Sequence, residues 1–367
     1  MVGLHLRWNG VWQRPNHIVS RIARDVPVIV LEEPLAAAHD DDAIERSDGL
    51  TIVTPLRSAP PADAIDARAV STIRALAGER RALVWLYTPM MLALADAFPD
   101  APLVFDKMDE LANFAHADPR IAPRERDVLE RAGVVFAGGR SLFRSVERRT
   151  RNPHCYPSGV DVTHFAGAHS VPPHPALPRC LGSSVFGYVG VIDERVDLEL
   201  VDALAAAYPR AEVVMIGPVV KIDASALPRR ANITYLGQRG YDELPALLAG
   251  IDVALMPFAL NEHTVNISPT KTLEYFAAGL PVVSTAIPDV VADHGDLVYI
   301  ARDRAEFIAL VLDAHSVEAP RRAERAAERA GASSWDAIAA AMRDDLACAG
   351  IVYAAVSPMR KNSAARL

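Results

Sequence analysis

Short apolar runs alternate with amphipathic stretches through the first 150 residues. Residues 26–31 (VPVIVL) and 82–87 (ALVWLY) are almost continuously apolar, as expected of strands that are covered on both faces. Stretches between such runs, for example 62–77 and 123–131, are predicted to be helical. Strands that alternate with helices predict an α/β fold with a parallel sheet and right-handed crossovers.

The pattern breaks between Cys155 and Gly182, where prolines are crowded and little periodicity survives. We place an interdomain linker at residues 161–182. A second alternation of strands and helices then runs from residue 185 to residue 315. Because 367 residues are too many for one ordinary core, the sequence predicts two domains, residues 1–160 and 183–335.

The C-terminal stretch divides into a helix and a tail. Trp335, Ile338, Met342 and Leu346 fall at helical spacing within residues 334–347, so this stretch is predicted to be the last helix. The residues after Val356 are polar and basic, and we predict that 357–367 is a disordered tail.

Composition and charge narrow the class of protein. Hydrophobic residues make up 51% of the chain and charged residues 23%, which is typical of a soluble globular protein. A net charge of -8 argues against a protein that binds nucleic acid through bulk electrostatics. Cys155, Cys180 and Cys348 have neither disulfide nor zinc spacing. With no signal-like N-terminus and no apolar run of membrane-spanning length, we expect a cytoplasmic protein.

Residues 266–285 combine a loop, a short helix and a buried strand. Ser268 is predicted to be the N-cap of the helix, and Pro269 suits the first helical position because it lacks an N–H. Gly279 stands where a C′ glycine ends a helix. Apolar residues on one face of this helix predict that the face is buried.

The polar face of this helix carries Thr270, Lys271 and Glu274. A helix N-terminus presents free N–H groups and partial positive charge to an anion, and a carboxylate one turn further in could accept both hydroxyls of a sugar diol. The pattern therefore indicates a nucleotide-sugar site. The alternative for Lys271 and Glu274 is an ordinary surface ion pair at i,i+3 spacing.

Several motifs together resemble the GT-B glycosyltransferases (group 1, family 4-like), which have two Rossmann-like domains with parallel sheets facing a central cleft. The motifs lie at 158–161 (SGVD), 186–190 (FGYVG), 213–218 (VVMIGP), 233–237 (ITYLG), 254–257 (ALMP) and 273–283 (LEYFAAGLPVV). Among subgroups, the chain is most similar to bacterial cell-surface polysaccharide enzymes of the teichuronic-acid type. The resemblance implies a donor site in residues 183–335 and an acceptor site in residues 1–160. It also implies that the C-terminal helix, at about 336–353, packs back on the first domain.

One position departs from the pattern of this family. Many retaining members carry two glutamates eight positions apart, the first near the donor sugar and the second on the nucleotide ribose. Glu274 matches the second, but the first position is Asn266. An amide can hydrogen-bond a sugar hydroxyl but carries no negative charge, so the donor sugar and the stereochemical course stay open.

The resemblance also implies roles for residues around the donor. The N–H groups at 268–271 would meet the diphosphate, and Lys271 or Arg195 would add a full positive charge. Such fixed donors stabilise the departing nucleoside diphosphate without a metal, so neither a metal nor a cofactor is expected. The alternatives are a solvated loop cation for Arg195 and ordinary strand-end turns for two glycines. The predicted donor-site residues are Gly190, Arg195, Gly217, Asn266, Ser268, Thr270, Lys271 and Glu274.

Two aspartates of the first half are candidates for the catalytic base. Asp106 and Asp109 follow the predicted strand at 102–105, and an open α/β sheet has its crevice at the carboxyl ends of its strands. Either carboxylate could deprotonate an acceptor hydroxyl if the enzyme inverts. Either could instead cap a helix.

Four arginines are candidates for a membrane contact. Arg140, Arg144, Arg148 and Arg151 recur at spacings of four, four and three on a predicted helix at 141–150. A solvated face is the ordinary interpretation of such a run. Because lipid-linked acceptors are common among similar enzymes, a weak contact with anionic membrane at the inner face of the cell membrane is the second interpretation.

These observations predict a metal-independent glycosyltransferase of the hexosyltransferase type. It would move a sugar from a nucleotide-diphosphate sugar to a saccharide or lipid-linked acceptor in cell-surface or extracellular polysaccharide synthesis. Two alternatives remain: a nucleotide-sugar epimerase of the same architecture, and a catalytically silent module that binds a nucleotide-sugar or a partner enzyme.

Overall fold

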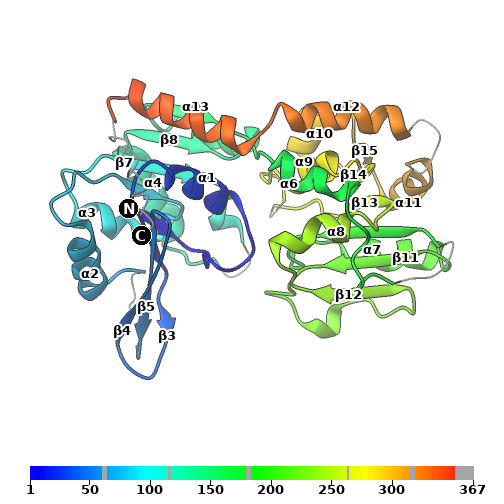
Figure 1. Ribbon diagram of the computed structural model, residues 1–367, viewed down its shortest axis with the longest axis horizontal. Helices are drawn as coiled ribbons and strands as arrows, with labels where there is room; N and C mark the ends of the chain where they lie inside the picture. The colour runs from blue at the N-terminus through cyan, green and yellow to red at the C-terminus, as the bar shows by residue number, and fades with distance from the viewer. Residues whose placement is uncertain (60–63, 115–116, 179–182, 263, 315–318, 352–367) are drawn as a thin grey trace, which may run out of the picture.

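The chain folds into two halves, each built on its own sheet (Figure 1). The computed structural model describes residues 1–59, 64–114, 117–178, 183–262, 264–314 and 319–351, with the backbone alone at 319 and 320. The predicted tail, 357–367, the end of the predicted C-terminal helix at 352–353 and Cys180 lie outside the described residues.

The first sheet is parallel apart from one hairpin at its edge. Its strands run in the order β3-β5-β2-β1-β6-β7-β8-β9, and β4 pairs antiparallel with β5. The central strands are buried along their length because helices cover both faces. The strands are β1 (Val2–Leu4), β2 (Val28–Glu32), β3 (Leu35–Ala36), β4 (Asp41–Ser47), β5 (Leu50–Arg57), β6 (Val84–Leu86), β7 (Leu103–Lys107), β8 (Val134–Ala137) and β9 (Pro153–Cys155).

Two groups of helices cover the first sheet. On one face α2, α4 and α5 bury Ile73, Val128 and Leu142. On the other face Ile18 of α1 shares a core with Trp335 and Met342 of the C-terminal helix α13, which lies over this half while α12 lies over the other (Figure 1). The helices of the first half are α1 (Arg14–Ile22), α2 (Ala67–Ala77), α3 (Leu92–Ala97), α4 (Ile121–Arg131), α5 (Arg140–Val146) and α13 (Trp335–Cys348).

The second sheet is parallel throughout, in the order β12-β11-β10-β13-β14-β15. Its strands are β10 (Val185–Val189), β11 (Glu212–Ile216), β12 (Ile233–Gly237), β13 (Val253–Met256), β14 (Val282–Thr285) and β15 (Tyr299–Ala301). Its helices are α7 (Leu198–Ala207), α8 (Leu244–Leu248), α9 (Lys271–Ala277), α10 (Pro288–His294), α11 (Arg304–Asp313) and α12 (Ala319–Gly331).

The segment predicted to be a linker belongs, as far as it is described, to the second half. It contains helix α6 (Val162–Ala166), and Phe165 and Leu177 are buried in the second core. Because only single apolar residues hold this proline-rich stretch against the core, its sequence has no periodic pattern that would have predicted its place in the second half. The chain passes from the first half to the second at Val160 instead, and it returns to the first half at Ser333–Trp335. The two crossings lie side by side: the Val160 N–H donates to the Ser333 carbonyl at 2.9 Å, and the Trp335 N–H donates to the Val160 carbonyl at 3.2 Å.

The four arginines do not share one helix, although the side chains of all four are exposed, as the ordinary interpretation predicts. Helix α5 ends at Val146, so Arg148 and Arg151 lie beyond it, and Arg140 is ion-paired with Asp293 of the second half. Spacing alone had extended the helix by one turn. No helix among the described residues has the length and apolarity that crossing a bilayer requires.

Candidate functional site

A narrow cleft lies between the carboxyl edges of the two sheets, with a cavity volume of about 130 Å³. Met108 and Asp109 after β7 and Gly138 after β8 line it from the first half. The second half contributes Gly190 after β10 and residues 267–271, which form the loop before α9 and the first residue of that helix. Of the residues predicted from sequence, the cavity is lined by Asp109, Gly190, Arg195, Ser268, Thr270 and Lys271.

Helix α9 begins later than predicted. Its first residue is Lys271 and its N-cap is Thr270, without a side-chain cap bond. Ser268 is therefore not the N-cap; it lies two residues before Thr270, and its carbonyl accepts a hydrogen bond from Ser158 Oγ at 2.9 Å. The C-terminus agrees with the prediction: Gly279 has φ +72°, and its N–H donates to the Phe276 carbonyl, closing a Schellman turn.

Glu274 lies deeper than a surface ion pair would. It is 4% exposed, and its Oε2 accepts a hydrogen bond from Lys271 Nζ at 3.1 Å. The ion pair between Lys271 and Glu274, predicted as the ordinary alternative, is therefore present. It is buried rather than at the surface, and a buried carboxylate requires such a partner because burial disfavours an unpaired charge. Burial, followed by the charge of Glu274, raises the pKa of Tyr241 well above its usual value. Asn266 is half-buried in the turn before this loop and lies outside the cavity lining.

Arg195 is held in place rather than solvated. Its guanidinium forms two parallel hydrogen bonds with Asp193, Nε to Oδ1 at 3.0 Å and Nη2 to Oδ2 at 2.7 Å. It also stands 5.5 Å from the ring centre of Phe114, which belongs to the first half. This two-point pairing fixes a full positive charge at the cleft.

Gly190 and Gly217 are needed because two backbone segments meet. Gly217 has φ +146°, and a Cβ there would overlap the carbonyl oxygen of Gly190. Gly190 lines the cavity, whereas Gly217 is not part of its lining. For Gly217 the alternative of a strand-end packing role fits the structure better than contact with a ligand.

The two candidate bases differ in access. Asp106 is 0% exposed and its Oδ1 is 3.0 Å from Arg14 Nε, so it is an internal ion-pair partner, and this burial argues against a role as base. Asp109 is half-buried and lines the cavity. Burial raises the pKa of Asp109 to about 6, although Arg195 and Lys221 oppose the rise.

A buried lysine holds the turn that presents Asp109. Lys107 Nζ donates to Glu110 Oε1 at 2.9 Å and to Glu125 Oε2 at 2.6 Å. These bonds tie the residues on either side of Asp109 to helix α4. The carboxylate of Asp109 is thus positioned by a network that does not use its own oxygens.

Comparison with known protein families identifies the second half of the chain, which forms one side of the cleft. Residues 183–316 match the family model described as Glycosyl transferases group 1. The segment is a glycosyl transferase group 1 domain. The putative teichuronic acid biosynthesis glycosyltransferase TuaH of Bacillus subtilis (strain 168) is 25% identical over 175 residues, which cover 46% of this chain and 44% of that protein. Less than half the length of that relative is therefore matched.

Solved structures extend the likeness to the whole architecture. Trehalose-6-phosphate synthase of E. coli bound with UDP-2-fluoro glucose superposes with a TM-score of 0.68 at 13% identity, covering 94% of this chain and 98% of that one. HepE of Anabaena in complex with UDP gives 0.67 at 16% identity, covering 95% and 99%. At such identities the likeness shows the fold alone. The chain has the GT-B fold, with two Rossmann-like domains.

Sequence reasoning missed Lys221 of the group 1 domain, which lies outside the cavity lining but close enough to Asp109 to oppose the rise of its pKa. Its backbone has φ +62°, the left-handed region that non-glycine residues rarely adopt. Its Nζ stands 4.1 Å from the ring centre of Phe114 and 3.9 Å from Glu194 Oε1. Burial and then Lys221 lower the pKa of His5 to about 4. The sequence around Lys221 (VVKID) carries no signal of this role.

Asp289 was missed as well. It accepts hydrogen bonds from the Ser141 N–H at 3.1 Å and from Ser141 Oγ at 2.6 Å, across the two halves. A Cβ on Gly139 would come within 2.6 Å of Asp289 Oδ2 and 2.8 Å of Ser268 Cβ. The glycine pair 138–139 therefore permits close approach of the two halves.

Aromatic side chains also make contacts between the two halves and around α13. Trp12 of the first half packs on Tyr241 of the second, with ring centres 5.5 Å apart. His17 stacks on Trp335 at 4.8 Å, and burial lowers the pKa of His17 to about 2. His17 is therefore a neutral packing group at physiological pH. No cluster of metal-ligating side chains occurs among the described residues.

Proposed function

We propose that the chain transfers a sugar from a nucleotide-diphosphate sugar to a saccharide or lipid-linked acceptor in cell-surface polysaccharide synthesis. The observation that carries this proposal is one cleft in which two cations of the second half, Arg195 and Lys271, line the same cavity as Asp109 of the first half, beside Arg14. Matches to group 1 glycosyl transferases and to TuaH support it.

Negative charge grows on the leaving nucleoside diphosphate during transfer. Arg195 and Lys271, each held by a carboxylate, would stabilise that charge without reorganising. Lys221 would add a third cation from the same domain. No step in this scheme requires a metal ion.

Asp109 would accept the proton of the acceptor hydroxyl. With a pKa of about 6, the carboxylate is ionised at neutral pH and remains a stronger base than an exposed aspartate. Its position after β7 places it on the acceptor side of the cleft, opposite the group 1 domain.

The cleft must widen before a donor can enter. Its 130 Å³ is below the roughly 300–1,000 Å³ that small-molecule sites usually offer. Widening would break contacts between the halves, including those of Asp289 with Ser141. Closing again over the bound donor would exclude water, with which transfer competes.

Calorimetry with UDP, GDP and ADP tests the donor site. The wild-type chain should bind at least one of these, and Glu274→Ala should abolish that binding because Glu274 would hold the ribose diol. Glu199→Ala, which removes an exposed carboxylate of the same domain, serves as the matched control and should bind normally. Unchanged affinity in Glu274→Ala would refute the assignment of the site.

A panel of nucleotide-sugars separates transfer from the two alternatives. Transfer releases nucleoside diphosphate faster when an acceptor is present. An epimerase converts the sugar without any acceptor and without that release, and a silent module binds without either reaction.

We propose a cytoplasmic location because Cys155 and Cys348 are free thiols.

A further inference from the structure

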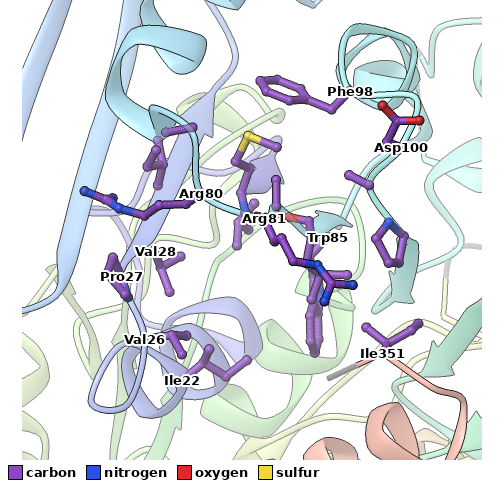
Figure 2. Close-up of a pocket in the computed structure, with 18 of the residues that line it drawn as sticks. Ile22, Val26, Pro27, Val28, Arg80, Arg81, Trp85, Phe98, Asp100 and Ile351 are labelled. Atoms are coloured by element: carbon purple, nitrogen blue, oxygen red, sulfur yellow. Dashed lines mark hydrogen bonds between the residues drawn. The ribbon is translucent and has the colours of Figure 1, made fainter. Parts of the chain in front are cut away.

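An apolar cavity lies at the amino edge of the first sheet, with a volume of about 970 Å³. Its lining includes Val28, Trp85 and Phe98, and Ile351, the last described residue, also contributes (Figure 2). Nothing in the nucleotide cleft is shared with it: the residues lining the two cavities do not overlap.

The cavity stands at the opposite end of the strands from the cleft. Val2 begins β1, Val28 begins β2, and Leu83 and Pro102 precede β6 and β7. The cleft lies after the last residues of β7 and β8. Because parallel strands all point the same way, a ligand in this cavity would be separated from the transfer site by the length of the sheet.

Two arginines give the cavity its charge. Arg80 and Arg81 line it and are exposed, and neither forms an ion pair or hydrogen bond with another described side chain. Figure 2 shows the two guanidinium groups on different sides of the residues drawn, with that of Arg80 directed away from that of Arg81. Asp100 is the acidic residue of the lining, so the charge balance of the site is positive.

We propose that this cavity binds a single-chain lipid with a phosphate head. The apolar walls would take the chain, and either guanidinium group, whose geometry matches phosphate, would take the head. The 970 Å³ volume lies within the range of small-molecule sites. The residues that follow Ile351 begin with the apolar run VYAAV at 352–356 and turn basic at Arg360, Lys361 and Arg366. The first five are compatible with the apolar walls, whereas the basic end is a poor electrostatic match for Arg80 and Arg81, so the shortened chain described below decides between the tail and a lipid.

Calorimetry on the full chain with octyl, decyl and dodecyl phosphate, each below its micelle concentration, tests the proposal. Each added CH₂ should tighten Kd about fourfold, as burial of hydrocarbon predicts. Inorganic phosphate should give no measurable heat. Decanol should bind roughly three- to tenfold more weakly than decyl phosphate, because it lacks the ion pairs. Absence of chain-length dependence, or equal affinity for decanol and decyl phosphate, would overturn the proposal.

Variants locate the binding. Arg80→Gln with Arg81→Gln should lower the affinity for decyl phosphate to that for decanol and leave decanol binding unchanged. Arg46→Gln with Arg126→Gln, exposed arginines elsewhere on the same half, should change neither. Equal losses in both pairs would indicate bulk charge and overturn the site.

Two further variants exclude other occupants. Lys271→Ala should leave decyl phosphate binding intact, because the phosphate would not sit in the nucleotide cleft; a loss would place the ligand there and refute the proposal. A chain that ends at Ile351 should bind as the full chain does. Binding seen only in the shortened chain would identify residues 352–367 as the occupant instead.

Discussion

Replacing Asp109 by asparagine should stabilise the protein while impairing its activity. Burial raises the pKa of Asp109 from its ordinary value of 3.8 to about 6. A rise of about two units corresponds to about 3 kcal/mol by which the folded state disfavours the ionised carboxylate. Asparagine resembles the protonated acid, so Asp109→Asn removes this penalty wherever the wild-type group is ionised.

The sign of the pH dependence follows from proton counts. Between pH 4 and pH 6 the folded protein holds a proton on Asp109 that the unfolded chain has already released. Stability of the wild type therefore falls as the pH rises through this window. The advantage of Asp109→Asn should be absent at pH 4, grow through pH 6 and reach up to about 3 kcal/mol at pH 8.

Urea unfolding followed by tryptophan fluorescence measures this difference. Trp8, Trp12, Trp85 and Trp335 all pack with the half of the molecule that carries Asp109, so the signal reports that half. Transfer by Asp109→Asn should fall by roughly 10²–10⁴, the usual contribution of a general base. A stability difference that is the same at pH 4 and pH 8 would refute the burial argument, and undiminished transfer would refute the catalytic one.

Three other substitutions follow from the structure. Lys221→Gly should lower nucleoside-diphosphate affinity by about tenfold in calorimetry, because it removes the ammonium while glycine accepts the left-handed backbone; unchanged affinity would show that the charge plays no part. Asp289→Ala leaves Ser141 donors without their partner, at a cost of about 1–3 kcal/mol to the closed arrangement, so the radius of gyration by solution scattering should increase; an unchanged radius would contradict this. Trp335→Ala should destabilise the protein by about 3–5 kcal/mol in urea unfolding, since this side chain is fully buried, and a loss below 1 kcal/mol would contradict its place in the core.

The sequence predicted what depends on local pattern. Alternating apolar runs gave the two parallel sheets, and Gly279 marked the end of α9 because only a left-handed residue closes that turn without strain. Residues 268–271 were predicted to meet an anion because a helix N-terminus presents free N–H groups, and Asp109 was predicted to lie at the crevice because it follows a strand of an open α/β sheet. Family resemblance carried the GT-B fold, which the structural likenesses confirm.

Features that depend on contacts between the halves could not be predicted. Lys221 acquires its place from Phe114, more than a hundred residues earlier, and Asp289 from Ser141. Asp106 and Asp109 look equivalent in sequence, yet only Asp106 is buried in an ion pair with Arg14. Burial and partner choice at such distances follow from tertiary packing, which no spacing along the chain encodes.

The crossing at Val160 and Trp335 means that the first half is not one continuous piece of chain. Residues 1–160 alone would lack α13 and leave the apolar face beside α1 bare. Met1 and Ile351 line the same cavity, so a short peptide could join them. A circular permutant that begins at residue 161 and ends at residue 160 would make each half contiguous. Each half could then be expressed and isotopically labelled separately, and reassembly from two fragments could be followed directly.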